Sequence, residues 1–557
     1  MSTSARRGPA ILSLLPSVAD YRDLPRSWKG DLLAGVTVGI VALPLALAFG
    51  VSSGAGAESG LVTAIIAGVV AAVFGGSHVQ VSGPTGAMVV VLAPIIAAHG
   101  AGALALVCLL AGLLVLIAGV LRLGRTISYI PWPVIEGFTL GIAVIIFLQQ
   151  VPTATGSHGG RSTNAAVAAV EALRAAPWPK LGWSLLLVAI VVVVMLVSLR
   201  IHPRFPGSLV AIVIAALFAG ILGLPVDTIG RLPAGLPAPV LPAFEPGMVA
   251  ALAGPAVAVA ALAAIESLLS ARVASTLADT GAYDADRELV GQGLASIASG
   301  LFGGMPATGA IARTAVGVRA GARTRVAAVT HGLLLLAIVL VGSAVVSRIP
   351  LAALAGVLMV TACRMIAPRT VRTILRTSRA DALVFCVTAV VTVSVDLIYA
   401  VLIGLLVAAF FALRQLARTS GVHREELPGV AQPGDERIAV FRLEGALFFG
   451  TAERTLERVA ALRDVEVVIL RMSQLQLLDA TGAQVVTELI SSLERRGVTV
   501  LVKGIRADHR EIAERVGVIS SLRHQNHLFD DLGAAVAHAR SHVARGDEGR
   551  GRAGGRR

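Results

Sequence analysis

An almost continuous apolar sequence runs from residue 31 to residue 415, and it restricts the fold more than any other feature of the chain. Only 15% of all residues are charged, whereas a soluble protein carries about a quarter. Runs such as 104–120 and 185–199 approach the roughly 20 residues that a helix needs to cross a bilayer. We therefore expect a polytopic α-helical membrane protein. The net charge of +13 would suggest a nucleic-acid partner for a soluble domain, but this composition argues against one.

Polarity divides the chain into five parts. Residues 1–30 are polar and basic and lack the apolar core of a signal peptide, so they are expected to form a cytoplasmic N-terminal segment. Residues 31–415 form the transmembrane domain, and the polar residues 416–435 are predicted to be a linker. Residues 436–544 have the pattern of a soluble domain, and the Gly/Arg-rich residues 545–557 are predicted to be a disordered tail.

The transmembrane domain separates into fourteen apolar segments, about 27 residues apart, which suits helices of about 20 residues with their loops. They lie near 31–50, 60–75, 84–98, 102–121, 133–150, 183–199, 207–223, 249–271, 288–303, 308–318, 326–346, 350–365, 380–395 and 397–414. The third and tenth segments are too short to cross a membrane alone.

Arginines gather in the loops that follow the even-numbered segments, while the opposite loops are poorer in basic residues. The residues concerned are Arg122, Arg125, Arg200, Arg204, Arg272, Arg287, Arg319, Arg323, Arg325, Arg364, Arg369, Arg372 and Arg376. This alternation predicts that both termini are cytoplasmic. We expect a multi-pass protein of the cell (inner) membrane.

The third and tenth segments interrupt the hydrophobic pattern in the same way. The first has Phe-Gly-Gly at 74–76 and Pro-Thr-Gly-Ala at 84–87, and the second has Phe-Gly-Gly at 302–304, proline at 306 and Thr-Gly-Ala at 308–310. They occupy matching places in two halves of seven segments. Because seven is odd, the halves must have opposite orientations, which gives a 7+7 inverted repeat.

Paired Gly/Pro interruptions indicate a substrate site between two half-helices at the midplane of the membrane. The first N–H groups of each half-helix and its partial positive charge favour an anion. The alternative is that glycine and proline serve only packing and kinking. The residues expected to bind substrate are Thr85, Gly86, Ala87, Thr308, Gly309 and Ala310.

Glu266 is the ionisable residue that stands out in the apolar segments, where charge is costly. With Ser270 one turn further on the same helix face, it could couple transport to Na⁺, or it could carry H⁺ alone; a structural hydrogen bond is the alternative. Arg313 could add positive potential to the cavity, pair with Glu266, or only pack. No catalytic set is visible, so an enzyme is not expected. Cofactors and metals are not expected either, and the three cysteines indicate none.

Strands and helices alternate in the C-terminal domain, which predicts an α/β fold. We expect strands at 438–443, 465–470 and 498–502 and helices at 452–463, 483–495, 508–516 and 529–540. Asp479 precedes a helix and is a candidate N-cap, and Thr481 is a candidate phosphorylation site.

Several motifs together resemble the SulP family of anion transporters with a C-terminal STAS domain. They are the opening segment 31–44, Ser-Gly-Pro-Thr-Gly at 82–86, Ile-Glu-Ser-Leu-Leu at 265–269, Glu-Leu-Val-Gly-Gln-Gly at 288–293, residues 306–314 and Asp-Ala-Thr-Gly at 479–482. The resemblance implies a core and a gate domain that move like an elevator, and a homodimer. It also implies substrate between 85–87 and 308–310, with Glu266 and Ser270 as coupling residues. Members that carry bicarbonate have Asp where this chain has Glu266.

The sequence therefore predicts a secondary active transporter of a small oxyanion, of the sulfate or bicarbonate type, coupled to protons or sodium. The alternatives are a C4-dicarboxylate transporter of the same family, a nucleobase–cation symporter, and a membrane-anchored STAS sensor that does not transport. The matched half-helices and Glu266 argue against the sensor, and the tail domain argues against the symporter.

Overall fold

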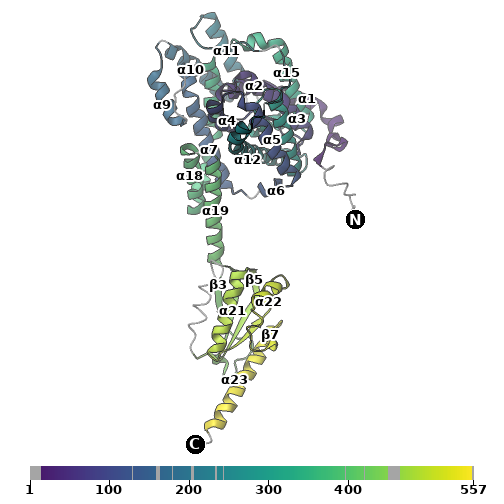
Figure 1. Ribbon diagram of the computed structural model, residues 1–557, viewed down its shortest axis with the longest axis vertical. Coiled ribbons are helices and arrows are strands. Elements are labelled where there is room, and N and C mark those ends of the chain that lie inside the picture. Colours follow the sequence, from purple (N-terminus) through teal and green to yellow (C-terminus); the bar gives the residue numbers. More distant parts are fainter. Residues whose placement is uncertain are drawn as a thin grey trace. The chain divides into compact units, whose positions relative to one another are not determined.

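A computed structural model describes most of the chain. The described residues are 14–127, 130–157, 164–178, 180–201, 206–232, 235–242, 244–395, 397–419, 421–448 and 464–554. The chain forms two compact units, Met1–Leu405 and Leu406–Arg557, and each is described by itself (Figure 1).

Unit 1 is almost entirely helical (Figure 1). Its main helices are α1 (Leu24–Ser52), α2 (Ala57–Val62), η3 (Thr63–Ala67), α3 (Gly68–Phe74), α4 (Gly86–His99), α5 (Ala103–Val120), α7 (Trp132–Gln149), α10 (Lys180–Ile201), α11 (Gly207–Ile221), α12 (Pro246–Leu277), α13 (Ala285–Leu301), α14 (Ile311–Ala320), α15 (Val326–Val346), α16 (Leu351–Met365) and α18 (Arg379–Ser394). Shorter helices are η2 (Val18–Tyr21), α6 (Gly124–Ile127), α8 (Val151–Ala154), α9 (Ala165–Ala175) and α17 (Pro368–Thr377). Helix α19 (Leu397–Thr419) begins in unit 1 and continues into unit 2.

Each of the fourteen predicted apolar segments corresponds to a helix, with α2, η3 and α3 together forming the second. Among the described residues, nine helices are long and apolar enough to cross a membrane. Helices α4 and α11 are apolar but shorter. The number of crossings therefore stays a prediction, whereas the helical membrane architecture is confirmed.

Small residues let helices α5 and α13 approach closely. A Cβ atom added to Gly112 would lie 2.8 Å from the Gly293 carbonyl oxygen, and one added to Gly293 would lie 2.7 Å from that of Gly112. Such contacts exclude any larger side chain at either position, and they are typical of helix pairs in membranes. This glycine pair holds α13 against α5. Helix α13 in turn supports the two interrupted segments at 74–87 and 302–310.

The N-terminal boundary and two loop arginines differ from the sequence prediction. Helix α1 begins at Leu24, inside the segment predicted to be polar and non-membrane, and Asp20 pairs with Arg287 at 2.7 Å. Arg325 is only 1% exposed and donates to the carbonyl oxygens of Ala72 and Gly75. Arg287 and Arg325 therefore satisfy buried acceptors and are not simply charges that set orientation.

Unit 2 contains a five-stranded sheet in the order β3-β4-β5-β6-β7. Strand β3 is antiparallel to β4, and the other pairs are parallel. The strands are β3 (Gly421–Glu425), β4 (Ile438–Leu447), β5 (Val467–Leu478), β6 (Thr499–Lys503) and β7 (Leu528–Phe529), with η4 (Asp435–Arg437) before β4 and η5 (Gln525–His527) before β7. This confirms the predicted α/β class.

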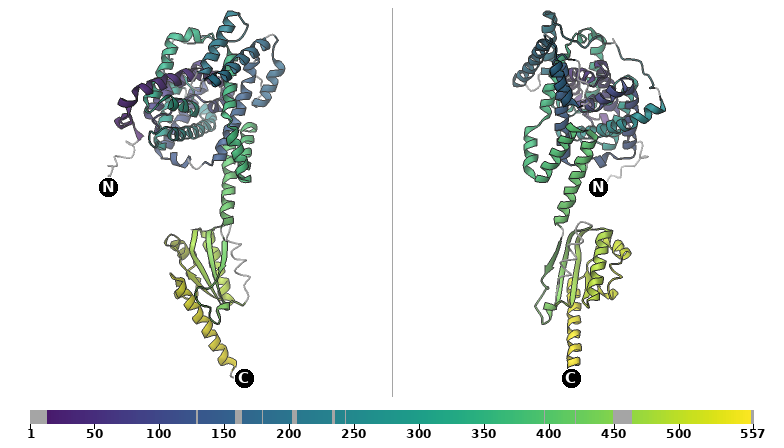
Figure 2. Two further views of the ribbon diagram at one scale, coloured as in Figure 1. Left: turned by 180° about the vertical axis from the view of Figure 1, so that it is seen from behind. Right: turned by 60° about the vertical axis from the view of Figure 1, so that its left-hand side comes forward.

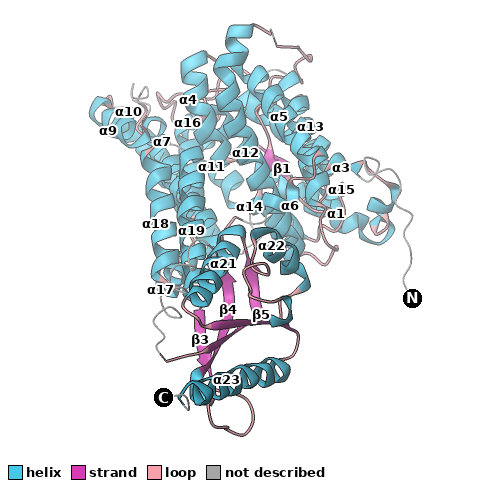
Figure 3. Ribbon diagram, turned by 60° about the horizontal axis from the view of Figure 1, so that its bottom comes forward, coloured by secondary structure: helices cyan, strands magenta, loops and turns pink. Residues whose placement is uncertain are grey.

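Helices lie on both faces of the sheet (Figures 2 and 3). Alternating residues of the central strands build two apolar layers, one on each face. Val468 and Leu470 of β5 pack with α21 (Ala480–Arg495) and α22 (Ala507–Val516). Val467 and Ile469 pack with α23 (Leu532–Gly554) on the other face. The period of two in a buried strand thus places α23 opposite the other two helices.

Three boundaries in this region differ from the prediction. The predicted linker 416–435 contains β3, an edge strand whose polar residues face away from the core and give no hydrophobic alternation. The boundary predicted at 415 falls inside α19. Helix α23 continues to Gly554, into the tail 545–557 that was predicted to be disordered, because it extends the helix that packs on the sheet. The predicted helix 452–463 lies outside the described residues.

Candidate functional site

The two interrupted segments pair directly with each other. Strand β1 (Ser82–Gly83), labelled in Figure 3, lies antiparallel to β2 (Thr308–Gly309), and its Ser82 is paired with Gly309. The Ala310 N–H extends this pairing by donating to the Val81 carbonyl oxygen at 2.8 Å. Antiparallel pairing is the arrangement expected of two matching segments related by a two-fold axis, as in an inverted repeat.

Each short strand leads into a short helix. Helix α4 begins at Gly86 after the extended residue Thr85, and α14 begins at Ile311 after the extended residue Ala310. Neither N-cap residue makes a side-chain capping bond, so the first N–H groups of both helices keep their capacity to donate. The second helix starts later than the predicted 308–318, because Thr308 and Gly309 are used in β2.

Glu266 of helix α12 joins the two segments. Its Oε2 atom accepts hydrogen bonds from the hydroxyls of Thr85 and Thr308, both at 2.8 Å. The two hydroxyl oxygens lie 3.0 Å apart. One carboxylate oxygen thus contacts the matching threonine of both halves, which was not predicted from the sequence.

Ser270 makes no hydrogen bond with Glu266 in the part of the chain that the structure describes. Its hydroxyl lies 3.4 Å from the Thr314 hydroxyl, which accepts from the Val81 N–H at 3.0 Å. Ser267 was not predicted as a site residue, yet its hydroxyl accepts from the Gly309 N–H at 3.1 Å. Its position one residue after Glu266 provided no signal for this contact.

Arg313 is 2% exposed and lies beside the start of α4. It donates through Nη2 to the Pro84 carbonyl oxygen, and its buried Nη1 has no partner among the described residues. It makes no ion pair with Glu266 within 4.0 Å in the same residues. Arg313 therefore lies close to the start of α4, and its role as a cavity charge stays a prediction.

The close packing around Gly86 and Gly309 explains why these positions are glycine. A Cβ at Gly86 would overlap Ile146 Cδ1, and a Cβ at Gly309 would overlap Gln80 Nε2. Ala87 and Ala310 are also small and are buried, at 5% and 7% exposed. The six predicted substrate residues thus lie in one compact region.

A second buried carboxylate supports this region and was not identified as a site residue from the sequence. Glu288 of α13 accepts from the Gly76 and Ser77 N–H groups at 2.8 and 3.0 Å. It also accepts from Gln80 Nε2 at 2.9 Å and from Gln292 Nε2 at 3.0 Å. Gln292 Nε2 in turn lies 2.6 Å from the Ser82 hydroxyl, so this network holds the chain that leads into β1.

The two candidate residues of unit 2 lie at the start of helix α21. Asp479 is the N-cap of α21, as predicted, and its Oδ1 accepts from the Gly482 N–H at 2.7 Å. Thr481 is exposed in the first turn of the same helix. Its modification stays a prediction.

Comparison with known proteins identifies the family. Residues 28–388 match the sulfate permease family, and residues 430–535 match the STAS domain. The chain belongs to the sulfate permease family. It is 34% identical to "Putative sulfate transporter YvdB" of Bacillus subtilis, over 91% of this chain and 96% of that protein. It is 30% identical to the bicarbonate transporter BicA of Synechocystis, over 92% and 94%. Members of this family are transporters, so the chain is an anion transporter and not an enzyme.

Solved structures agree with the fold of this sulfate permease family member. The transmembrane domain of a cyanobacterial BicA covers 69% of the chain and 98% of its own length, with a TM-score of 0.62 and 31% identity. The structure of SLC26A9 covers 97% of the chain and 94% of its own length, with a TM-score of 0.82. At 18% identity, the second likeness concerns the fold alone.

Proposed function

We propose that this protein is a secondary active transporter of a small oxyanion, sulfate or bicarbonate, and that the anion binds at the starts of α4 and α14. The observation that carries the proposal is the contact of Thr85 and Thr308 with one oxygen of Glu266. It brings the beginnings of two half-helices, one from each half of the chain, around one carboxylate. Helix starts bind anions through free N–H groups and their partial positive charge.

The close packing and composition of this region favour a small anion. Thr85, Ala87, Thr308 and Ala310 are all less than 10% exposed, and the glycines leave no room for side chains. Arg313 adds a full positive charge close to Pro84. The curated relatives named above are described as sulfate and bicarbonate transporters, which supports these two substrates before a C4-dicarboxylate.

Glu266 is the proposed coupling residue. When the anion approaches, a proton on Glu266 removes a like charge from the site, so proton binding and anion binding favour each other. A sodium site made by Glu266 and Ser270 is less well supported, because the Ser270 hydroxyl contacts Thr314 in this structure. We therefore propose protons, before sodium, as the coupling ion.

The remaining features of the proposal rest on the family resemblance and on the distribution of arginines between loops. We propose that the helix starts and Glu266 move together as one body in an elevator-like cycle, that the protein is a homodimer, and that both termini are cytoplasmic. The dense hydrogen bonding between α12, α13 and the two broken segments supports movement as one body.

Flux into proteoliposomes tests the substrate and the coupling ion. We expect saturable uptake of sulfate or bicarbonate that is driven by an imposed proton gradient and unaffected by fumarate or uracil. The same vesicles with a sodium gradient, and vesicles without protein, are the controls. Uptake of uracil alone would contradict the anion site, and uptake of fumarate alone would replace the substrate by a dicarboxylate. If no solute moves, a sensor role gains support.

A further inference from the structure

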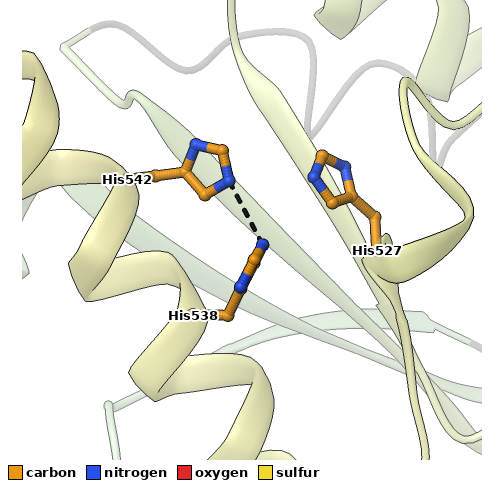
Figure 4. A group of neighbouring side chains, drawn as sticks. All are labelled: His527, His538 and His542. Atoms are coloured by element: carbon orange, nitrogen blue, oxygen red, sulfur yellow. Dashed lines mark hydrogen bonds between the residues drawn. The ribbon is translucent and has the colours of Figure 1, made fainter.

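Three histidines of unit 2 come together from two elements that are separate in sequence. His527 ends η5, just before the edge strand β7, and His538 and His542 lie one turn apart on α23. One ring nitrogen from each of the three lies within 4.8 Å of the others. Figure 4 shows the three rings turned toward one another. This group was not predicted from the sequence.

The spacing of the ring nitrogens is close to that of a metal site. His538 Nε2 and His542 Nε2 lie 3.2 Å apart. Two nitrogens bound tetrahedrally to Zn²⁺ at about 2.0–2.1 Å are separated by about 3.3 Å. The ring nitrogen of His527 lies within 4.8 Å of the other two. Relative shifts of about 1–2 Å would bring all three to the tetrahedral spacing, and rotation of the partly exposed His538 and His542 side chains can supply them.

His527 is buried and not fully satisfied by the protein. It is 2% exposed, and its Nδ1 atom has no hydrogen-bond partner among the described residues. The backbone of Val500 also interacts with its ring. A metal-bound histidine commonly uses one ring nitrogen for the metal and the other for a backbone carbonyl. Burial of an incompletely paired imidazole is costly unless a ligand completes its bonds.

The protonation state of the group suits metal binding. Burial and the nearby Arg545 lower the pKa of His542 to about 4, and burial and His538 lower the pKa of His527. Both rings are therefore neutral near pH 7, which is the form that binds metals. The other groups facing the cluster are His524 and two arginines: Arg523, which pairs with Glu494 at 3.0 Å, and Arg545, which donates to the Ser541 carbonyl oxygen.

We propose that His527, His538 and His542 bind one divalent transition-metal ion of the Zn²⁺ class, with water completing the coordination. Three imidazoles without a carboxylate favour Zn²⁺, Ni²⁺ or Cu²⁺ over Mg²⁺ or Ca²⁺, which prefer oxygen ligands. The ion would join α23 to the residues before β7. It would therefore fasten the helix that packs on one face of the sheet.

Metal binding by the full-length protein tests this proposal. The chain is purified in detergent without a polyhistidine tag, and Zn²⁺ is titrated in competition with a fluorescent chelator. We expect one Zn²⁺ per chain, no binding of Mg²⁺, and a visible absorption band of tetrahedral type with Co²⁺. Zn²⁺ is also expected to raise the unfolding temperature, because a ligand that binds only the folded state stabilises it.

A double variant on the partly exposed helix face distinguishes a metal site from neutral packing. His538→Gln with His542→Gln should lower Zn²⁺ affinity by more than about 100-fold, since loss of a residue that only orients a metal ligand already costs about 10–100-fold. His423→Gln in β3 is the matched control and should bind like the wild type. Similar unfolding temperatures without metal establish that the double variant is folded. Equal Zn²⁺ binding by wild type and double variant, or no binding by the wild type, would overturn the proposal.

Discussion

Glu266→Gln is expected to abolish accumulation of the anion while leaving its passive exchange. Glutamine keeps the shape of the side chain and still accepts from the Thr85 and Thr308 hydroxyls, but it cannot carry the coupled proton. A pH difference of one unit, coupled one to one, supports about tenfold accumulation, because about 1.4 kcal/mol corresponds to a factor of ten. We expect the wild type to approach that ratio in proteoliposomes and the variant to stop at equal concentrations.

Glu136→Gln is the matched control for this experiment. Glu136 lies near the start of α7 and accepts from Trp132 Nε1 of the same helix at 3.1 Å, away from the two broken segments. Its variant should accumulate the anion like the wild type. If Glu266→Gln also retains full accumulation, Glu266 is only a structural link between the halves, and the coupling residue has to be sought elsewhere.

Glu288→Ala is expected to destabilise unit 1 strongly. The substitution removes the acceptor of four hydrogen bonds, two from backbone N–H groups and two from glutamine side chains. Each buried donor left without a partner costs about 1–3 kcal/mol, so the total is on the order of 4 kcal/mol or more. A fall of several degrees in the unfolding temperature in detergent, or loss of the folded protein, is the expected result.

Asp286→Ala provides the comparison within the same helix. Asp286 is also in the first turn of α13, but among the described residues its carboxylate accepts one hydrogen bond from another helix, that of the Gly124 N–H of α6 at 3.0 Å. Its loss should therefore cost about 1 kcal/mol. Equal unfolding temperatures for the two alanine variants would mean that the Glu288 network contributes nothing to stability.

The helical architecture could be predicted from sequence because hydrophobicity and length act locally. Apolar segments of about 20 residues have few alternatives to a membrane helix, and all fourteen became helices. The matching of 84–87 with 308–310 was also visible, because both motifs interrupt the pattern in the same way. The central strands β4, β5 and β6 followed from buried apolar runs such as 467–470, whereas the edge strands β3 and β7 were not predicted.

The contacts between distant residues could not be predicted in this way. Thr308 and Gly309 form a strand and not a helix start, because they pair with β1. Since β1 lies more than 200 residues earlier, the local sequence contained no sign of this pairing. The role of Arg325 could not be predicted either. An arginine in a loop sequence gives the same pattern whether its side chain faces solvent or donates to buried carbonyl oxygens. The three histidines meet only because α23 packs across the sheet.

The most direct test of the proposed site is the initial uptake rate of the transported anion by the double variant Thr85→Val with Thr308→Val. Valine has nearly the shape of threonine but lacks the hydroxyls that join the helix starts to Glu266. Hydrogen bonds to a charged group are worth about 1.5–3 kcal/mol each, so we predict a loss of at least about 100-fold. Thr361→Val, which removes a hydroxyl that donates within α16, should keep the wild-type rate. An unchanged rate in the folded double variant would contradict the proposed site.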